Sequence, residues 1–133
     1  MKKIVSVLLI LVTTVTALSA TGTQEDKVSI AVTWSGDELK AFEETVAAFE
    51  EQSGIDVEIE SVGRDISTIL TTRINAGNPP DLSAIPNPGQ MKEFAQKGHL
   101  VALDSSVVKD HPAAFTNLGS VDGKLYGVFL AAD

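Results

Sequence analysis

Aromatic and polar side chains follow three predicted strands of this chain, and together they could bind a small polar ligand. An aromatic face stacks on the apolar side of a sugar ring, and hydroxyl, carboxylate, amide and guanidinium groups bond to its hydroxyls. We predict ligand binding, with no catalytic residue and no metal ligand in the set. The predicted ligand-binding residues are Trp34, Ser35, Glu38, Arg64, Asp65 and Asn87.

The first three of these residues also have structural interpretations. Trp34 could close the top of the hydrophobic core, and the core and ligand interpretations have equal weight. Ser35 and Glu38 have the spacing of a capping box, in which each side chain accepts a backbone N–H at a helix start. We favour capping over ligand contact for these two, although a helix N-terminus also attracts polar ligand groups.

The remaining three residues have structural alternatives as well. Arg64 could pair with Asp65 or Glu60 on the surface, where an ion pair contributes little. Asp65 and Asn87 could each cap a helix, and Pro88 suits the first helical position after Asn87. For both of these residues we favour the capping role.

The spacing of hydrophobic residues predicts the strands and helices that hold these residues. Their order is strand, helix, strand, helix, strand, helix, which indicates an α/β fold with a mainly parallel sheet flanked by helices. Ligands bind beyond the carboxyl ends of such strands, which selects the loops 34–38, 62–65 and 85–90. The strands are predicted at 28–34, 55–60 and 81–86, and the helices at 36–53, 66–76 and 88–97.

The second strand and the C-terminal part have signals of their own. Residues 55–60 alternate between apolar and acidic, which predicts one dry face, one wet face and a place at the sheet edge. Asp122-Gly123 is a strong hairpin-turn signal before a predicted strand at 125–130. Residues 105–109 predict a single helical turn, and residues 100–103 an extended apolar run.

The first twenty residues have the layout of a secretory signal peptide. Lys2 and Lys3 precede the apolar run 4–12, which is too short to span a bilayer comfortably. We predict a cleaved signal peptide at 1–20, a flexible polar segment at 21–27, and export to the periplasm or the extracellular space. Residues 18–21 resemble a lipoprotein signal with Thr21 in place of the Cys, so we expect no lipid anchor.

Composition excludes several classes of function. The chain of 133 residues has a formal net charge of −8, which disfavours nucleic acid and anionic membranes as partners. It has no cysteine, so disulfides, thiolate catalysis and Cys-type zinc sites are excluded. His99 and His111 lack metal-ligand spacing, and no cofactor is predicted. A secreted glycan-active enzyme and a stand-alone structural or interaction module remain as alternatives.

Four segments of the chain resemble family 1 extracellular solute-binding proteins of sugar-import ABC transporters. They are Ala76-Gly77-Asn78-Pro79-Pro80-Asp81, the Gly98-x-Leu100-x-x-Leu103-Asp104 spacing, Asp122-Gly123-Lys124-Leu125-Tyr126-Gly127-Val128, and the first helix with the strand after it. Arg64-Asp65 and Pro86-Asn87-Pro88-Gly89 resemble the α-glucoside subset. The resemblance implies binding without catalysis, with a sugar and ABC permease membrane subunits as partners and a monomeric state.

The resemblance also implies an architecture. Members of the family have two lobes that close on the ligand, and residues 28–133 resemble part of an N-terminal lobe, truncated before the second lobe. The expected fold is therefore a periplasmic-binding-protein-like lobe. Phe129 stands where many relatives have Pro, which weakens the similarity near the expected hinge.

Overall fold

The computed structural model describes residues 27–129. The predicted signal peptide at 1–20, most of the predicted flexible segment and the last residue of the predicted strand at 125–130 lie outside the described residues. Lys27, predicted as the end of that flexible segment, is instead the first residue of a strand. No helix within residues 27–129 is long and apolar enough to cross a membrane.

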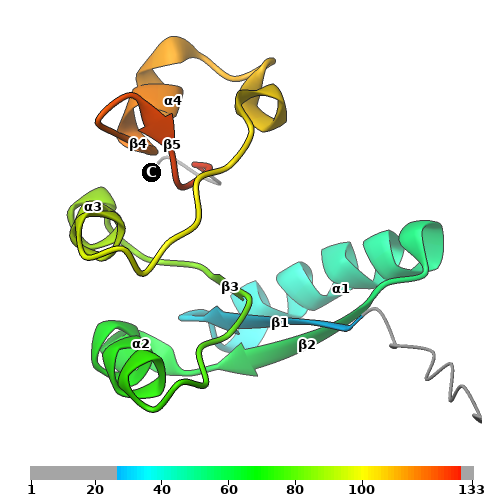
Figure 1. Cartoon of the computed structure of the whole chain (residues 1–133). Coiled ribbons are helices and arrows are strands. Elements are labelled where there is room, and N and C mark those ends of the chain that lie inside the picture. Colours follow the sequence, from blue (N-terminus) through cyan, green and yellow to red (C-terminus); the bar gives the residue numbers. More distant parts are fainter. Residues whose placement is uncertain (1–26, 130–133) are drawn as a thin grey trace, which may run out of the picture.

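A three-stranded parallel sheet organises the first two thirds of the described chain (Figure 1). Its strands are β1 (Lys27–Val32), β2 (Asp56–Ser61) and β3 (Leu82–Ser83), in the order β2-β1-β3. Both pairings are parallel, with Val28 opposite Val57 and Ile30 opposite Leu82. The predicted parallel α/β fold and the edge position of the second strand are therefore confirmed.

Helices follow each strand, as the sequence predicts. They are α1 (Gly36–Ser53), α2 (Ile66–Asn75), which continues from the 3-10 turn η1 (Gly63–Asp65), and α3 (Pro88–Gln96). Gly54 ends α1 in the left-handed region at φ 73°, a conformation that most other residues adopt only with strain. Helices α1 and α2 each return the chain to the edge of the sheet where the preceding strand began. All three strands therefore begin at the same edge and pair in parallel.

The core lies between the sheet and α2 and α3. Ala31 of β1, Ile66 and Leu70 of α2, and Phe94 of α3 form one buried cluster. In contrast, α1 contains no buried residue, and its Phe49 is 49% exposed. Glu43, Glu44 and Glu51 of α1 are exposed, and the helix lies beside β1 and β2 (Figure 1).

The C-terminal part forms a small unit beside α3 (Figure 1). It contains η2 (Ser105–Val108), α4 (Ala113–Leu118), β4 (Ser120–Val121) and β5 (Lys124–Leu125). β4 and β5 pair antiparallel through Asp122 and Gly123, which have φ 48° and 76°, so the predicted hairpin is confirmed.

In the C-terminal part, one expectation needs correction and one helix was not expected. The strand predicted at 125–130 is regular only at Lys124–Leu125 within the described residues, because the following backbone turns to contact Gly119. The helix α4 was not predicted, since its six residues lack a side-chain cap and begin directly after Pro112. The predicted extended run 100–103 contributes one isolated bridge, from Leu103 to Leu125.

Candidate ligand-binding cavity at the carboxyl ends of the strands

A cavity of about 350 Å³ opens where the turns after β1 and β3 meet the C-terminal unit. This volume is at the lower end of the range for small-molecule sites. The position agrees with the rule that ligands bind beyond the carboxyl ends of parallel strands. The lining residues are Thr33, Trp34, Ala84, Ile85, Pro86, Asn87, Pro88, Met91, Leu118, Gly119, Gly127, Val128 and Phe129.

Trp34 is half-buried on one wall of this cavity. Its ring packs against Phe42 of α1 at a centroid distance of 4.9 Å and an interplanar angle of 47°. Its backbone carbonyl accepts a hydrogen bond of 2.6 Å from the Ser61 hydroxyl at the end of β2. The residue therefore joins α1 and β2 to β1, and it also presents aromatic surface to the cavity.

Asn87 follows β3 and lines the same cavity. Its side-chain oxygen accepts a hydrogen bond of 3.0 Å from the Gln90 backbone N–H, so the predicted N-cap of α3 is confirmed. This cap uses the oxygen, which leaves the amide N–H₂ as the group that can donate to a ligand. Capping and ligand contact are compatible in this residue.

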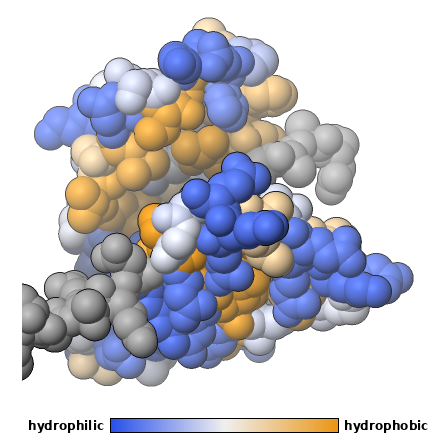
Figure 2. Space-filling view, turned by 90° about the vertical axis from the view of Figure 1, so that its right-hand side faces the viewer, coloured by the Kyte–Doolittle hydropathy of each residue, from blue (hydrophilic) through white to orange (hydrophobic). Residues whose placement is uncertain are grey.

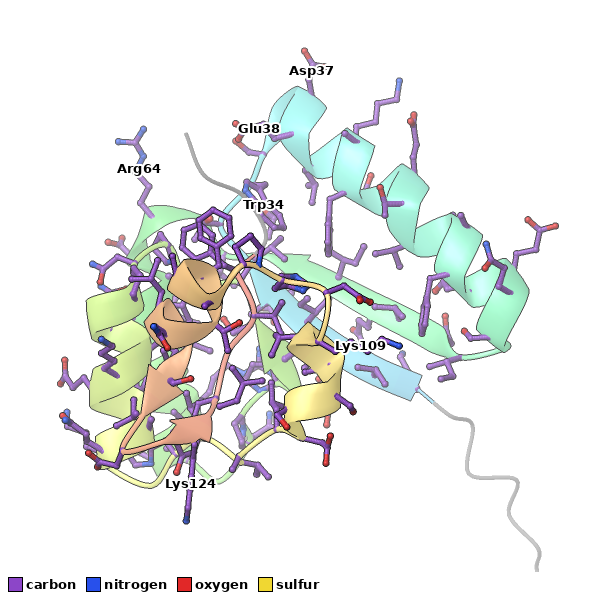
Figure 3. All side chains as sticks on the ribbon, turned by 90° about the horizontal axis from the view of Figure 1, so that it is seen from above. Trp34, Asp37, Glu38, Arg64, Lys109 and Lys124 are labelled. Carbon is purple, nitrogen blue, oxygen red and sulfur yellow. The ribbon has the colours of Figure 1, made fainter. Side chains whose placement is uncertain are left out.

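The predicted capping box of α1 is wrong. Ser35 stands at the N-cap position with extended backbone, but its side chain makes no capping hydrogen bond. We attribute this to Gly36, whose left-handed backbone at φ 58° reorients the chain at the helix start. Ser35 and Glu38 are exposed and do not line the cavity, although Figure 3 shows Glu38 at the same end of the molecule as Trp34.

Arg64 and Asp65 also lie outside the cavity lining. The predicted capping role of Asp65 is wrong, because Asp65 occupies the N-cap position of α2, directly after η1, without a side-chain capping hydrogen bond. The predicted surface partner Glu60 pairs instead with Arg73 of α2. Figure 3 shows Arg64 extending away from the ribbon, so it stands apart from Trp34.

The structure thus brings two of the six predicted residues, Trp34 and Asn87, into one cavity. The part of the lining that Met91 of α3 and the C-terminal unit supply was not predicted from the sequence. Phe129 on that wall stacks on Phe115 of α4 at 5.3 Å and 9°. The signal available was the Asp122–Val128 motif, but its long-range contact with α4 could not be derived from spacing alone.

The cavity is neutral and mainly apolar. Thr33 and Asn87 are the polar residues in the lining, and no charged side chain lines it within the described residues. Residues 27–129 also contain no group of three His, Cys, Asp or Glu side chains that could hold a metal ion. The arrangement can stack on an uncharged ligand and offer it a few hydrogen bonds.

Comparisons with known proteins agree with this arrangement. Residues 33–128 match the family of bacterial extracellular solute-binding proteins. The osmoprotective compounds-binding protein GgtB of a Synechocystis strain is 33% identical over 130 residues, which cover 93% of this chain and 31% of that protein. The alpha-glucosides-binding periplasmic protein AglE of Rhizobium meliloti is 30% identical over 70 residues, 53% of this chain and 15% of that protein.

A solved structure shares the same fold. It is an ABC substrate-binding protein from Listeria monocytogenes in complex with cycloalternan, similar at 29% identity and a TM-score of 0.64 over 76% of this chain and 28% of that chain. The chain spans less than a third of the length of the curated relatives named above. The family match covers most of the described residues, and on this ground the chain belongs to the bacterial extracellular solute-binding proteins.

Proposed function

We propose that this chain supplies one wall of the sugar site of an exported solute-binding protein that serves an ABC importer. The observation that carries the proposal is the neutral cavity that has Trp34 and Phe129 in its lining and the Asn87 amide beside them. Aromatic surface with a few convergent polar groups is the chemistry that a pyranose ring requires. The protein partners in this proposal are the membrane permease subunits, and the binding protein acts as a monomer.

Relatives support the class of ligand. One is named for binding alpha-glucosides, and another was solved in complex with cycloalternan. An α-glucoside or a related oligosaccharide is therefore the ligand that we propose for this cavity. The glycan-active enzyme that the sequence left open is disfavoured, because the family consists of binding proteins of transporters.

The proposed mechanism is capture followed by presentation to the permease. The Trp34 ring removes the apolar face of the sugar from water, while the Asn87 amide donates to a ring hydroxyl. A second lobe closing over the exposed face of the ligand would bury the remaining hydroxyls. Such closure is a population shift, and it requires contacts that only the closed state makes. The predicted signal peptide at 1–20 supports the export that this proposal includes.

Trp34 provides its own assay, because it is the only tryptophan in the chain. We expect maltose, trehalose and maltotetraose to change its fluorescence emission in a saturable way. One wall buries only part of a sugar, so the dissociation constant should be weak, on the order of 1 mM. The acyclic polyol mannitol serves as a control, since it has no ring face to stack and should give no saturable change.

A matched variant tests the hydrogen bond that we assign. Asn87→Asp keeps the oxygen that caps α3 but removes the amide donor, so sugar affinity should fall while the melting temperature stays unchanged. Absence of any saturable response to the three sugars would overturn the proposed function. Micromolar binding would instead contradict the assignment of this chain to a single wall.

A further inference from the structure

Two glycines, Gly119 and Gly127, line the cavity together with Met91. Neither has a left-handed backbone, so neither is required by its φ angle. The reason for glycine at each position must therefore come from what a side chain would meet there.

Packing explains Gly119. A Cβ atom at this position would stand 1.9 Å from the carbonyl oxygen of Gly127, which is backbone and cannot move aside. The carbonyl of Gly119 accepts hydrogen bonds from the N–H groups of Tyr126 and Gly127, at 2.9 and 3.2 Å. Glycine is needed here so that the end of α4 can lie directly against the segment after β5.

Packing does not explain Gly127. A Cβ atom there would meet only the Met91 side chain, at 3.5 Å from Cγ and 3.9 Å from Sδ, which is ordinary van der Waals contact. The fold could therefore carry a side chain at this position. Since Gly127 and Met91 both line the cavity, any such side chain would take up space on its wall.

We propose that Gly127 is a specificity-determining residue, which sets the size of the sugar unit that the cavity admits. Its missing side chain leaves open the space beside the Met91 thioether, and that space belongs to the cavity that Trp34 also lines. This inference rests on the proposed function and adds a size limit to it. A bulkier residue at this position would favour smaller ligands over larger ones.

The test is a series of substitutions measured by Trp34 fluorescence and thermal melting. We expect Gly127→Ala to fold with an unchanged melting temperature and to weaken maltotetraose binding about tenfold, the effect of one misplaced methylene in an apolar pocket. Gly127→Leu should abolish saturable binding of maltotetraose while the smaller maltose still binds, as a size limit requires. Ala102→Leu adds bulk at an exposed position outside the cavity lining and should bind as the original chain does.

The outcomes separate this inference from the proposed function. If the original chain binds sugars and both Gly127 variants bind equally well, the inference is wrong and the proposed function stands. If Gly127→Ala does not fold, the space beside Met91 is not open, and the inference also fails. If the original chain binds none of the sugars, the proposed function fails and this inference fails with it.

Discussion

At the scale of single residues, Asp81 ties the start of β3 to the central strand β1. Its carboxylate accepts hydrogen bonds from the Ser29 hydroxyl at 2.6 Å and the Ser29 backbone N–H at 2.8 Å, and its own N–H donates to that hydroxyl at 3.0 Å. These bonds replace ladder pairing just before a strand that is only two residues long. The hydrogen bond from the Ser29 hydroxyl lowers the pKa of Asp81 most, and the bond from the Ser29 backbone N–H lowers it further.

This geometry predicts a pH dependence for the stability of the chain. A carboxyl whose pKa is lower in the folded than in the unfolded state stabilises the fold above its unfolded pKa of about 3.9 and loses that contribution as the pH falls. The melting temperature should therefore drop below about pH 4, and Asp81→Asn should lower it at neutral pH while reducing the drop. Thermal melts from pH 7 to pH 3 measure this.

A second variant identifies the partner. Ser29→Ala removes the shared hydroxyl. The double variant Ser29→Ala with Asp81→Asn should therefore lower the melting temperature by less than the sum of the two single variants. Asp110→Asn changes an exposed carboxylate elsewhere and should leave the pH profile unchanged. Fully additive effects of Ser29→Ala and Asp81→Asn would contradict the assigned coupling.

At the scale of elements, two helix starts that look equivalent in the sequence differ in the structure. Asn87 caps α3 through its side chain, whereas Ser35 occupies the N-cap of α1 without a capping bond. Asn87→Ala should therefore lower the free energy of unfolding by about 1 kcal/mol, the usual cost of a lost cap. Ser35→Ala is the matched control and should change stability little, as denaturant titration can measure. Equal losses in both variants would mean that Ser35 caps α1 after all.

The same comparison marks how far the sequence determines the fold. Periodicity and helix stops identify β1, α1, β2, α2 and α3, because these signals are local. The turn at Asp122-Gly123 is local too. Capping by Ser35 depends on the backbone of the next residue, and α4 depends on contacts with the hairpin, so neither can be read from spacing. The part of the cavity lining that comes from the C-terminal unit was not predicted for the same reason, because it depends on contacts between segments that are distant in the sequence.

At the scale of the whole molecule, the sheet ends in an open and partly apolar edge. A second cavity of about 340 Å³ lies along β3, between α2, α3 and the segment that leads to η2. Three of its lining residues, Leu82, Val101 and Leu103, are 52%, 84% and 39% exposed. Figure 2 shows apolar surface across the middle of one face of the molecule. Exposed strand edges with apolar neighbours promote association between chains.

We therefore expect the isolated chain to be monomeric when dilute and to associate as its concentration rises. Leu82→Lys combined with Val101→Lys should reduce this association, because charges on an open edge oppose strand pairing. Light scattering after size exclusion measures the mass at each concentration. Ala47→Lys combined with Ala48→Lys adds the same charge on the exposed face of α1 and separates a local effect from one of net charge. If that control reduces association equally, the edge of β3 is not where the chains meet.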